Sequence, residues 1–367
     1  MSTLAQDLEE NRRKIHTDSY PMSIGELINL YRDGEIDIHP EFQRIYRWSD
    51  SQKSKLIESI LLGIPLPSIF VAQRADGIWD VVDGLQRLST IFSFIGILKD
   101  ENQNLLKPLE LTATEYLPAL EGIVWSNDED TDKELSADIK RAFKREKIDI
   151  KIIKKESDEN AKYDLFQRLN TGGSSLSPQE VRNCLLIMID HDIYDWLKKL
   201  SEDENFRNCV PLSAKQAEEQ GYMELVLRFV VYRHIEKEEV KKYSDLTDLL
   251  TGALQTIFIE RKLDLVEEEK SFYRVFNFLS TTLEDDSFRK YNHSKGKYMG
   301  GFSLSIFEVI AIGLSFSTKT DIELKSMIEV VSKELSVDEY FLDNTSHGTR
   351  SINRFQILTE YGKTKFI

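Results

Sequence analysis

Five consecutive residues, Asp83-Gly84-Leu85-Gln86-Arg87, combine groups that can bind and hydrolyse a phosphate ester. They follow a β-type run and precede apolar residues at helical spacing, so they fall at a helix start, where free N–H groups and the helix dipole favour an anion. Arg87 can donate to phosphate oxygens, Asp83 can hold a water or a divalent cation, and Gln86 can orient an attacking water. We take these three as catalytic candidates. An Asp-Gly pair is also a common turn in which Asp83 merely caps the helix.

A second concentration of binding groups lies in residues 41–48, ahead of the next helix. It supplies an amide, a guanidinium and two aromatic rings: Gln43, Arg44, Tyr46 and Trp48. Such a loop can stack on a base and attract a phosphate. The alternative is a surface loop that packs Phe42 and Trp48 into the core.

The elements that position these residues are clear from local signals. Ser23-Ile24-Gly25-Glu26 has capping-box spacing and predicts a helix over residues 23–33. A helix from Ser49 or Asp50 to Gly63 is also predicted. Strands are predicted at residues 36–39, 68–72 and 78–82, the last two joined by a hairpin turn at 75–77.

Farther along the chain, residues 148–153 predict a strand and residues 158–169 a helix. Ser177-Pro178-Gln179-Glu180 begins another helix, because serine, proline and glutamate occupy the cap, first and third positions. Helical spacing then dominates, with segments at residues 223–231, 246–259, 272–281 and 304–314.

The chain has 367 residues, 41% of them apolar and 30% charged, which is enough for two domains. We predict an α+β fold. Its core, with a small mixed sheet, spans residues 15–185 and contains an acidic, irregular insertion or mobile loop at about residues 100–140. A mainly helical region follows at residues 186–367.

The net charge of −15 disfavours a broad surface that coats nucleic acid. A local basic groove at residues 144–155 is an alternative to the usual solvated face. Cys184 and Cys209 are far apart, which predicts two buried thiols in a reducing compartment. The polar N-terminus and the lack of a long apolar segment predict a cytoplasmic protein.

Five segments together resemble the N-terminal domain family of GmrSD-type restriction systems. They occur in the family's order and lie at residues 41–48, 56–67, 82–90, 166–173 and 176–182. The resemblance implies a core similar to ParB and sulfiredoxin, in which a Gly-x-x-Arg turn at a helix start holds phosphates. By that likeness Gly84 and Arg87 hold a nucleoside triphosphate, with Mg²⁺ as the metal.

The remaining nucleotide-binding candidates come from the two loops and the helix start: Gln43, Arg44, Tyr46, Trp48, Ser89, Thr90, Arg168, Asn170, Thr171 and Gly172. A left-handed helix cap explains residues 170–172 equally well. Arg168 and Arg182 can instead pair with nearby carboxylates. The family motif is DGQQR, and Leu85 replaces its first glutamine, a change that bears on hydrolysis more than on binding.

Family members often carry a C-terminal His-Asn-His nuclease half. No such motif is recognised here, since His293 and His347 are isolated, and we expect a stand-alone member. The leading hypothesis is a nucleoside triphosphatase (NTPase) of a prokaryotic anti-phage or restriction-type defence system. The alternative is a non-catalytic, nucleotide-responsive adaptor or a ParB-like DNA-binding module that regulates a separate nuclease. Candidate partners are DNA, a nuclease subunit and a second copy of the chain. Burial of the Arg87 guanidinium against a carboxylate, with no cleft leading to it, would count against the phosphate site.

Overall fold

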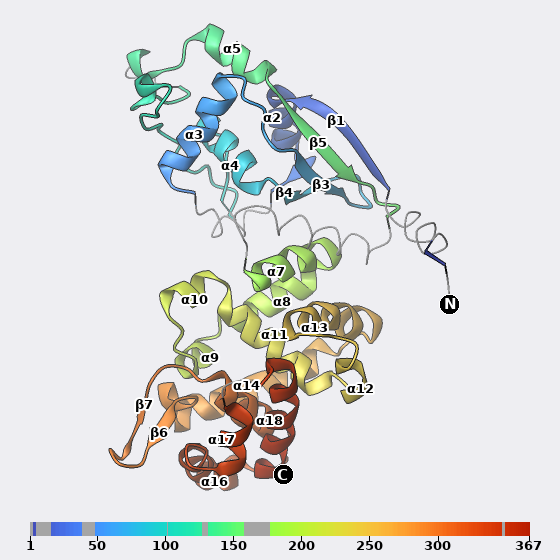
Figure 1. The fold of residues 1–367 in the computed structure, drawn as a ribbon, viewed down its shortest axis with the longest axis vertical. Coiled ribbons are helices and arrows are strands. Elements are labelled where there is room, and N and C mark those ends of the chain that lie inside the picture. The colour runs from blue at the N-terminus through green and yellow to red at the C-terminus, as the bar shows by residue number, and fades with distance from the viewer. Residues whose placement is uncertain are drawn as a thin grey trace. The chain divides into compact units, whose positions relative to one another are not determined.

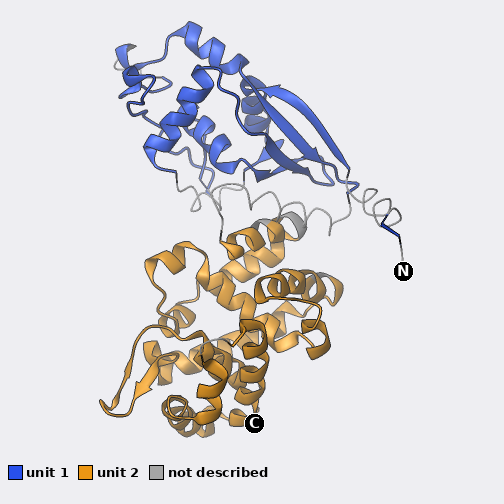
Figure 2. Ribbon diagram, in the orientation of Figure 1, with its two compact units in different colours: residues 1–175 blue, residues 176–367 orange. Residues whose placement is uncertain are grey.

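The computed structural model describes residues 3–4, 16–38, 48–100, 102–126, 131–157, 177–346 and 349–367. The chain divides into two compact units, Met1–Ser175 and Leu176–Ile367 (Figure 2). The division lies ten residues before the limit of 185 that the sequence suggested, because α7 (Pro178–Ile189) belongs to the second unit. The fold is α+β, as the sequence predicted.

Unit 1 is built on a mixed five-stranded sheet in the order β1-β5-β3-β4-β2. Its strands are β1 (Thr17–Ser23), β2 (Ile36–Asp37), β3 (Ile69–Gln73), β4 (Trp79–Asp83) and β5 (Lys147–Ile153). β1 pairs antiparallel with β5, and β3 antiparallel with β4, whereas the β3–β5 and β2–β4 pairs are parallel. The predicted β3–β4 hairpin is confirmed, and Gly77 takes a φ of 96° in its turn.

The helices of unit 1 begin where the capping residues placed them. α2 (Ile24–Asp33) is capped by Ser23, and α3 (Asp50–Leu61) by Ser49 in a full capping box with Gln52. α4 (Leu85–Ile95) packs against α3 (Figure 1) and buries every residue from Arg87 to Ile95. This helix therefore lies in the core and fixes the 83–87 turn against it.

The acidic segment at residues 100–140 is irregular in its described parts, with short 3-10 turns at Pro118–Leu120 and Thr131–Lys133. It nevertheless adds large apolar side chains to the core: Leu109, Leu111, Leu120, Trp125 and Leu135. The described part is therefore packed into the core, and α5 (Ala137–Arg145) follows directly. Residues 144 and 145 of the basic stretch end this helix.

Unit 2 is mainly helical. After α7, its helices are α8 (His191–Ser201), α9 (Glu204–Cys209), α10 (Ala214–Glu218), α11 (Gly221–His234), α12 (Lys237–Val240), α13 (Leu246–Ala253), the π-helix Leu254–Glu260, α14 (Leu265–Thr282), the 3-10 turn Glu284–Asp286, α15 (Leu304–Phe316), α16 (Asp321–Glu334), α17 (Glu339–Thr345) and α18 (Ser351–Phe366). A hairpin of β6 (Lys290–Asn292) and β7 (Lys297–Met299) interrupts them (Figure 1). No helix in the described ranges is long and apolar enough to cross a membrane.

Polar side chains inside unit 2 pair with one another. Arg182 is 1% exposed and donates to Glu224 at 2.7 Å, as the sequence allowed. Arg228 also binds Glu224 and donates to the Tyr232 hydroxyl at 2.7 Å. The predicted capping box of Ser177 and Glu180 is present at the start of α7. Cys209 is buried and free, as expected, whereas the Cys184 side chain lies outside the described part.

Candidate functional site

The turn between β4 and α4 depends on Gly84. This residue caps the helix with a φ of 100°, a left-handed conformation that side chains resist. A Cβ added there would lie 2.8 Å from Ile69 Cγ1 and 3.2 Å from Arg87 Nη2. Glycine is thus required both for its backbone angles and for close packing, and the backbone at this turn is left uncovered by a side chain of its own.

The start of α4 has no side-chain cap. The first intrahelical bond runs from Leu88 N to Gly84 O at 3.0 Å, and the amides before it have no acceptor within the helix. The cap is Gly84, so the interpretation of Asp83 as a simple capping residue is wrong. A helix start without a capping side chain suits an anionic ligand.

The Arg87 guanidinium holds this turn from inside. It is 9% exposed and donates from Nη2 to Asp83 Oδ2 at 2.9 Å. Its Nη1 donates to Ser68 O at 3.2 Å and also to Pro67 O. Burial lowers the pKa of the guanidinium, and the Asp83 carboxylate opposes that shift. Arg87 thereby joins the end of β4, the start of α4 and the segment that leads into β3.

This is the arrangement that counts against a phosphate contact by Arg87 itself, because the guanidinium is buried against a carboxylate. The carboxylate is not buried with it, since the Asp83 side chain is 37% exposed. Asp83 therefore presents a negative group at the surface of the turn, and Arg87 fixes its position. A direct contact between Arg87 and a phosphate stays a prediction.

The other candidates on α4 lie deeper. Ser89 is 1% exposed and Thr90 is fully buried, so both face the core of unit 1. The Thr90 hydroxyl donates to Gln86 O at 2.7 Å, as hydroxyls in helices commonly do. The Ser89 hydroxyl has no hydrogen-bond partner among the described residues. Gln86 is half-buried in the first turn, beside Arg87.

The two loops are described only at one residue. Trp48 is half-buried and packs against the core of unit 1, which agrees with the interpretation of that ring as a packing residue. The remaining loop candidates lie outside the described residues: Gln43, Arg44, Tyr46, Arg168, Asn170, Thr171 and Gly172.

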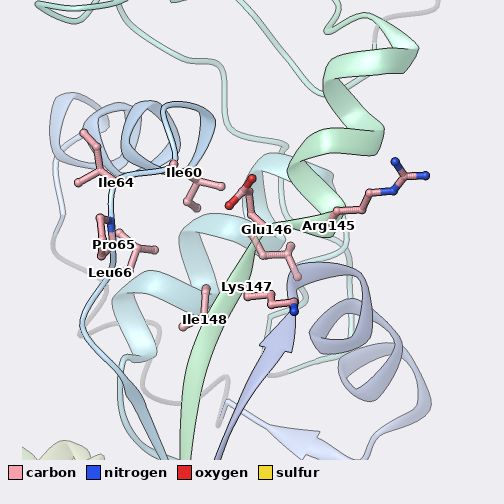
Figure 3. Close-up of a pocket in the computed structure, with 10 residues that line it drawn as sticks. Ile60, Ile64, Pro65, Leu66, Arg145, Glu146, Lys147 and Ile148 are labelled. Carbon is pink, nitrogen blue, oxygen red and sulfur yellow. The ribbon is translucent and has the colours of Figure 1, made fainter.

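A hollow of about 350 Å³ opens next to the segment that Arg87 holds (Figure 3). Its walls are mostly apolar: Ile24, Ile60, Gly63, Ile64, Pro65, Leu66, Arg145, Glu146, Lys147 and Ile148. The Arg145 guanidinium is directed away from it. Pro65 and Leu66 line the hollow, and the next residues, Pro67 and Ser68, accept from Arg87. The sequence analysis missed this hollow, although Ile64, 46% exposed after Gly63, was a local signal.

A second buried ion pair lies at the opposite end of β3 and β4. Arg74 Nε donates to Asp80 Oδ2 at 2.9 Å, and its Nη2 donates to Asp37 Oδ2 at 2.8 Å. Burial acts to lower the Arg74 pKa, but the two carboxylates outweigh it and raise the pKa above its usual value. This triad ties β2, β3 and β4 together, and we assign it to the stability of the sheet.

Residues 24–187 match the sequence model of a family described as the GmrSD restriction endonuclease, N-terminal domain. The chain carries a GmrSD N-terminal domain. The match begins at the first residue of α2 and includes the 83–87 turn and most of α7. Because the family is described by its place in a restriction endonuclease, the GmrSD domain assigns the chain to a restriction-type defence context.

Neither the curated proteins nor the solved structures contain a match to the chain. The likeness to ParB and sulfiredoxin therefore stays a prediction. Within the described ranges, no group of three or more His, Cys, Asp or Glu side chains is placed to hold a metal ion. His293 is exposed at the surface of unit 2, and His347 lies outside those ranges.

Proposed function

We propose that the GmrSD domain binds a nucleoside triphosphate with Mg²⁺ at the 83–87 turn and hydrolyses it as part of a restriction-type defence system. One observation carries the proposal. Gly84, with a φ of 100° and no room for a Cβ, begins a helix that no side chain caps. A glycine turn of this kind lets a phosphate approach backbone amides closely.

The residues of the turn then have separate tasks. The first amides of α4 donate to phosphate oxygens. Asp83, half-exposed, holds Mg²⁺ or the attacking water, and Gln86 orients that water. Arg87 is a positioning residue, because its donors are used by Asp83 and by the carbonyls of Pro67 and Ser68. This assignment moves the phosphate contact from the guanidinium to the backbone.

The proposal places the chain in the cytoplasm, where nucleoside triphosphates and Mg²⁺ are available. Its proposed partners are DNA, a separate nuclease subunit or a second copy of the chain. Hydrolysis would then control what that partner does, as nucleotide-driven switches do.

Two observations favour a second candidate function, a nucleotide-responsive adaptor that does not hydrolyse its ligand. Leu85 stands where the family motif DGQQR has a glutamine, and the Arg87 guanidinium is held inside the fold. Both remove groups that could stabilise charge during phosphoryl transfer. Binding without phosphate release, in the presence of Mg²⁺ and DNA, would establish this candidate in place of the first.

The test is equilibrium binding of all four radiolabelled nucleoside triphosphates to the full chain, with and without Mg²⁺. We expect at least one to bind in the micromolar range and to release phosphate with Mg²⁺. A failure of all four to bind would overturn both candidates, because each requires an occupied turn.

A matched pair of variants locates the ligand. Gln86→Glu adds a carboxylate in the first turn of α4, where it suits the helix dipole but repels phosphate. Gln52→Glu makes the same change in the first turn of α3, and the exposed Gln52 side chain already accepts from Ser49 N at 2.9 Å. We expect Gln86→Glu to weaken binding at least ~10-fold, which is about 1.4 kcal/mol, and Gln52→Glu to leave it unchanged. Equal affinity in both variants would remove the ligand from this turn.

A further inference from the structure

The β6–β7 hairpin of unit 2 is a basic element in an acidic protein. The chain has a net charge of −15, yet no Asp or Glu occurs from Ser287 to Phe307. That stretch contains four cationic residues, Arg289, Lys290, Lys295 and Lys297. The hairpin projects from the helices of unit 2 (Figure 1). Its charge is therefore presented away from the helical core.

The register of the two strands sorts the hairpin into two faces. Tyr291 pairs with Tyr298, whereas Lys290 pairs with Met299 and Asn292 with Lys297. Directly opposed residues share a face, and successive residues alternate between faces. The tyrosines therefore occupy one face, and Lys290 and Lys297 occupy the other.

The tyrosine face rests on α16. The Tyr298 hydroxyl lies 2.6 Å from Ser332 Oγ, and Lys333 Nζ lies 5.6 Å from the centre of the Tyr291 ring. The two tyrosine rings are 5.0 Å apart and half-buried. His293, next to the tip, has its Nε2 3.1 Å from Lys333 O. These contacts fix the hairpin and leave its lysine face outward.

The lysines of the hairpin have no acidic partners. Lys290, Lys295 and Lys297 are exposed, and no carboxylate of the described chain lies within ion-pair distance of them. Other exposed lysines of unit 2 are paired, as in Lys199 with Glu269 and Lys241 with Glu238. Arg289, at the base, binds Asp285 at 2.7 Å and so anchors the hairpin. Three unpaired cations remain on one projecting ribbon.

We propose that the outer face and tip of this hairpin bind the phosphate backbone of duplex DNA. A two-stranded ribbon fits the major groove, and lysines supply the phosphate contacts that position a protein on DNA. The Asn292, Ser294 and Gly296 tip adds small polar groups and a close backbone approach. The aromatic rings are turned to α16, so they are not available to stack on the bases of a single strand. The geometry thus favours a duplex over single-stranded nucleic acid.

The experiment measures binding of the full chain to a fluorescein-labelled duplex of about 20 base pairs by anisotropy, from about 50 to 200 mM salt. The test variant carries Lys290→Gln, Lys295→Gln and Lys297→Gln. The control carries Lys242→Gln, Lys262→Gln and Lys325→Gln, three other exposed lysines of unit 2, so both variants lose the same charge. The duplex is compared with one of its single strands, and folding is followed by thermal melting.

We expect the hairpin variant to bind the duplex at least ~10-fold more weakly and to lower the slope of log K against log salt by up to about 2.7, which is 0.9 for each of three phosphate contacts. The control variant should stay within about twofold of the unaltered chain. Equal losses in the two variants would overturn the proposal, and so would absence of duplex binding by the unaltered chain. Tighter hairpin-dependent binding of the single strand would overturn it as well. The outcome does not depend on nucleotide binding by the GmrSD domain.

Discussion

Replacing Gly84 by alanine tests whether the turn is built as described. A left-handed φ costs an alanine roughly 1–2 kcal/mol. The added Cβ would also lie 2.8 Å from Ile69 Cγ1, a side chain that is fully buried and cannot move away. Overpacking of this kind costs roughly 1–3 kcal/mol more. The expected loss of unfolding free energy is therefore about 2–5 kcal/mol.

Gly77→Ala is the matched control. Gly77 also lies in unit 1 and has a φ of 96°, but nothing lies within 4 Å of the Cβ that alanine would add. It should lose only the backbone part, roughly 1–2 kcal/mol. The difference between the two variants isolates the contact with Ile69.

Urea unfolding followed by tryptophan fluorescence provides the assay. Three of the four tryptophans, Trp48, Trp79 and Trp125, are in unit 1, so the signal reports mainly on that unit. Gly84→Ala should unfold at a clearly lower urea concentration than Gly77→Ala. If the two variants differ by less than about 0.5 kcal/mol, the close packing of the turn against β3 is refuted.

Two further predictions concern buried groups of unit 2. Burial would raise the Glu268 pKa, but hydrogen bonds from His234 and Arg233 outweigh it and lower the pKa to about 2. The stabilisation is present above the unfolded pKa near 4.5 and is lost as the pH falls toward 2, so Glu268→Gln should flatten the loss of stability in that range and cost up to about 3 kcal/mol at neutral pH. An unchanged acid profile from pH-dependent urea unfolding would contradict this. Burial raises the pKa of the Cys209 thiol to about 12, so Cys209→Ser should leave the rate of thiol labelling in the folded protein unchanged, whereas a slower rate would show that Cys209 is accessible.

Local signals explain what the sequence predicted well. The caps of α2, α3 and α7 were placed correctly because each serine accepts from an amide only three residues away. The β3–β4 hairpin followed in the same way from its short turn. The glycine at the 83–87 turn was also identified from its neighbours, since a strand and an apolar helix flank it directly.

Long-range contacts explain what the sequence did not predict. β1 was missed because most of its side chains are exposed, and only its pairing with β5, distant in the chain, makes it a strand; Pro21 is tolerated there because β1 is an edge strand. The partners of Arg87 were missed for the same reason. Pro67 and Ser68 lie 20 and 19 residues away, and only the folded sheet brings their carbonyls to the guanidinium.

The hairpin in unit 2 shows a third kind of limit. Its strands are three residues each and carry lysines where a predicted strand would show apolar alternation. Its position on α16 comes from the two tyrosines, whose contacts depend on a helix some 40 residues farther along. Sequence patterns alone could register the charge of this stretch but not the separation of its faces.

Hydrogen–deuterium exchange of the full chain, with and without a nucleoside triphosphate and Mg²⁺, tests the central claim most directly. If phosphates bind the first amides of α4, peptides that contain residues 83–88 should exchange more slowly with nucleotide, and peptides from the start of α3 should not change. Nucleotide binding that leaves the 83–88 peptides unprotected, or protects only other parts of the chain, would contradict the account.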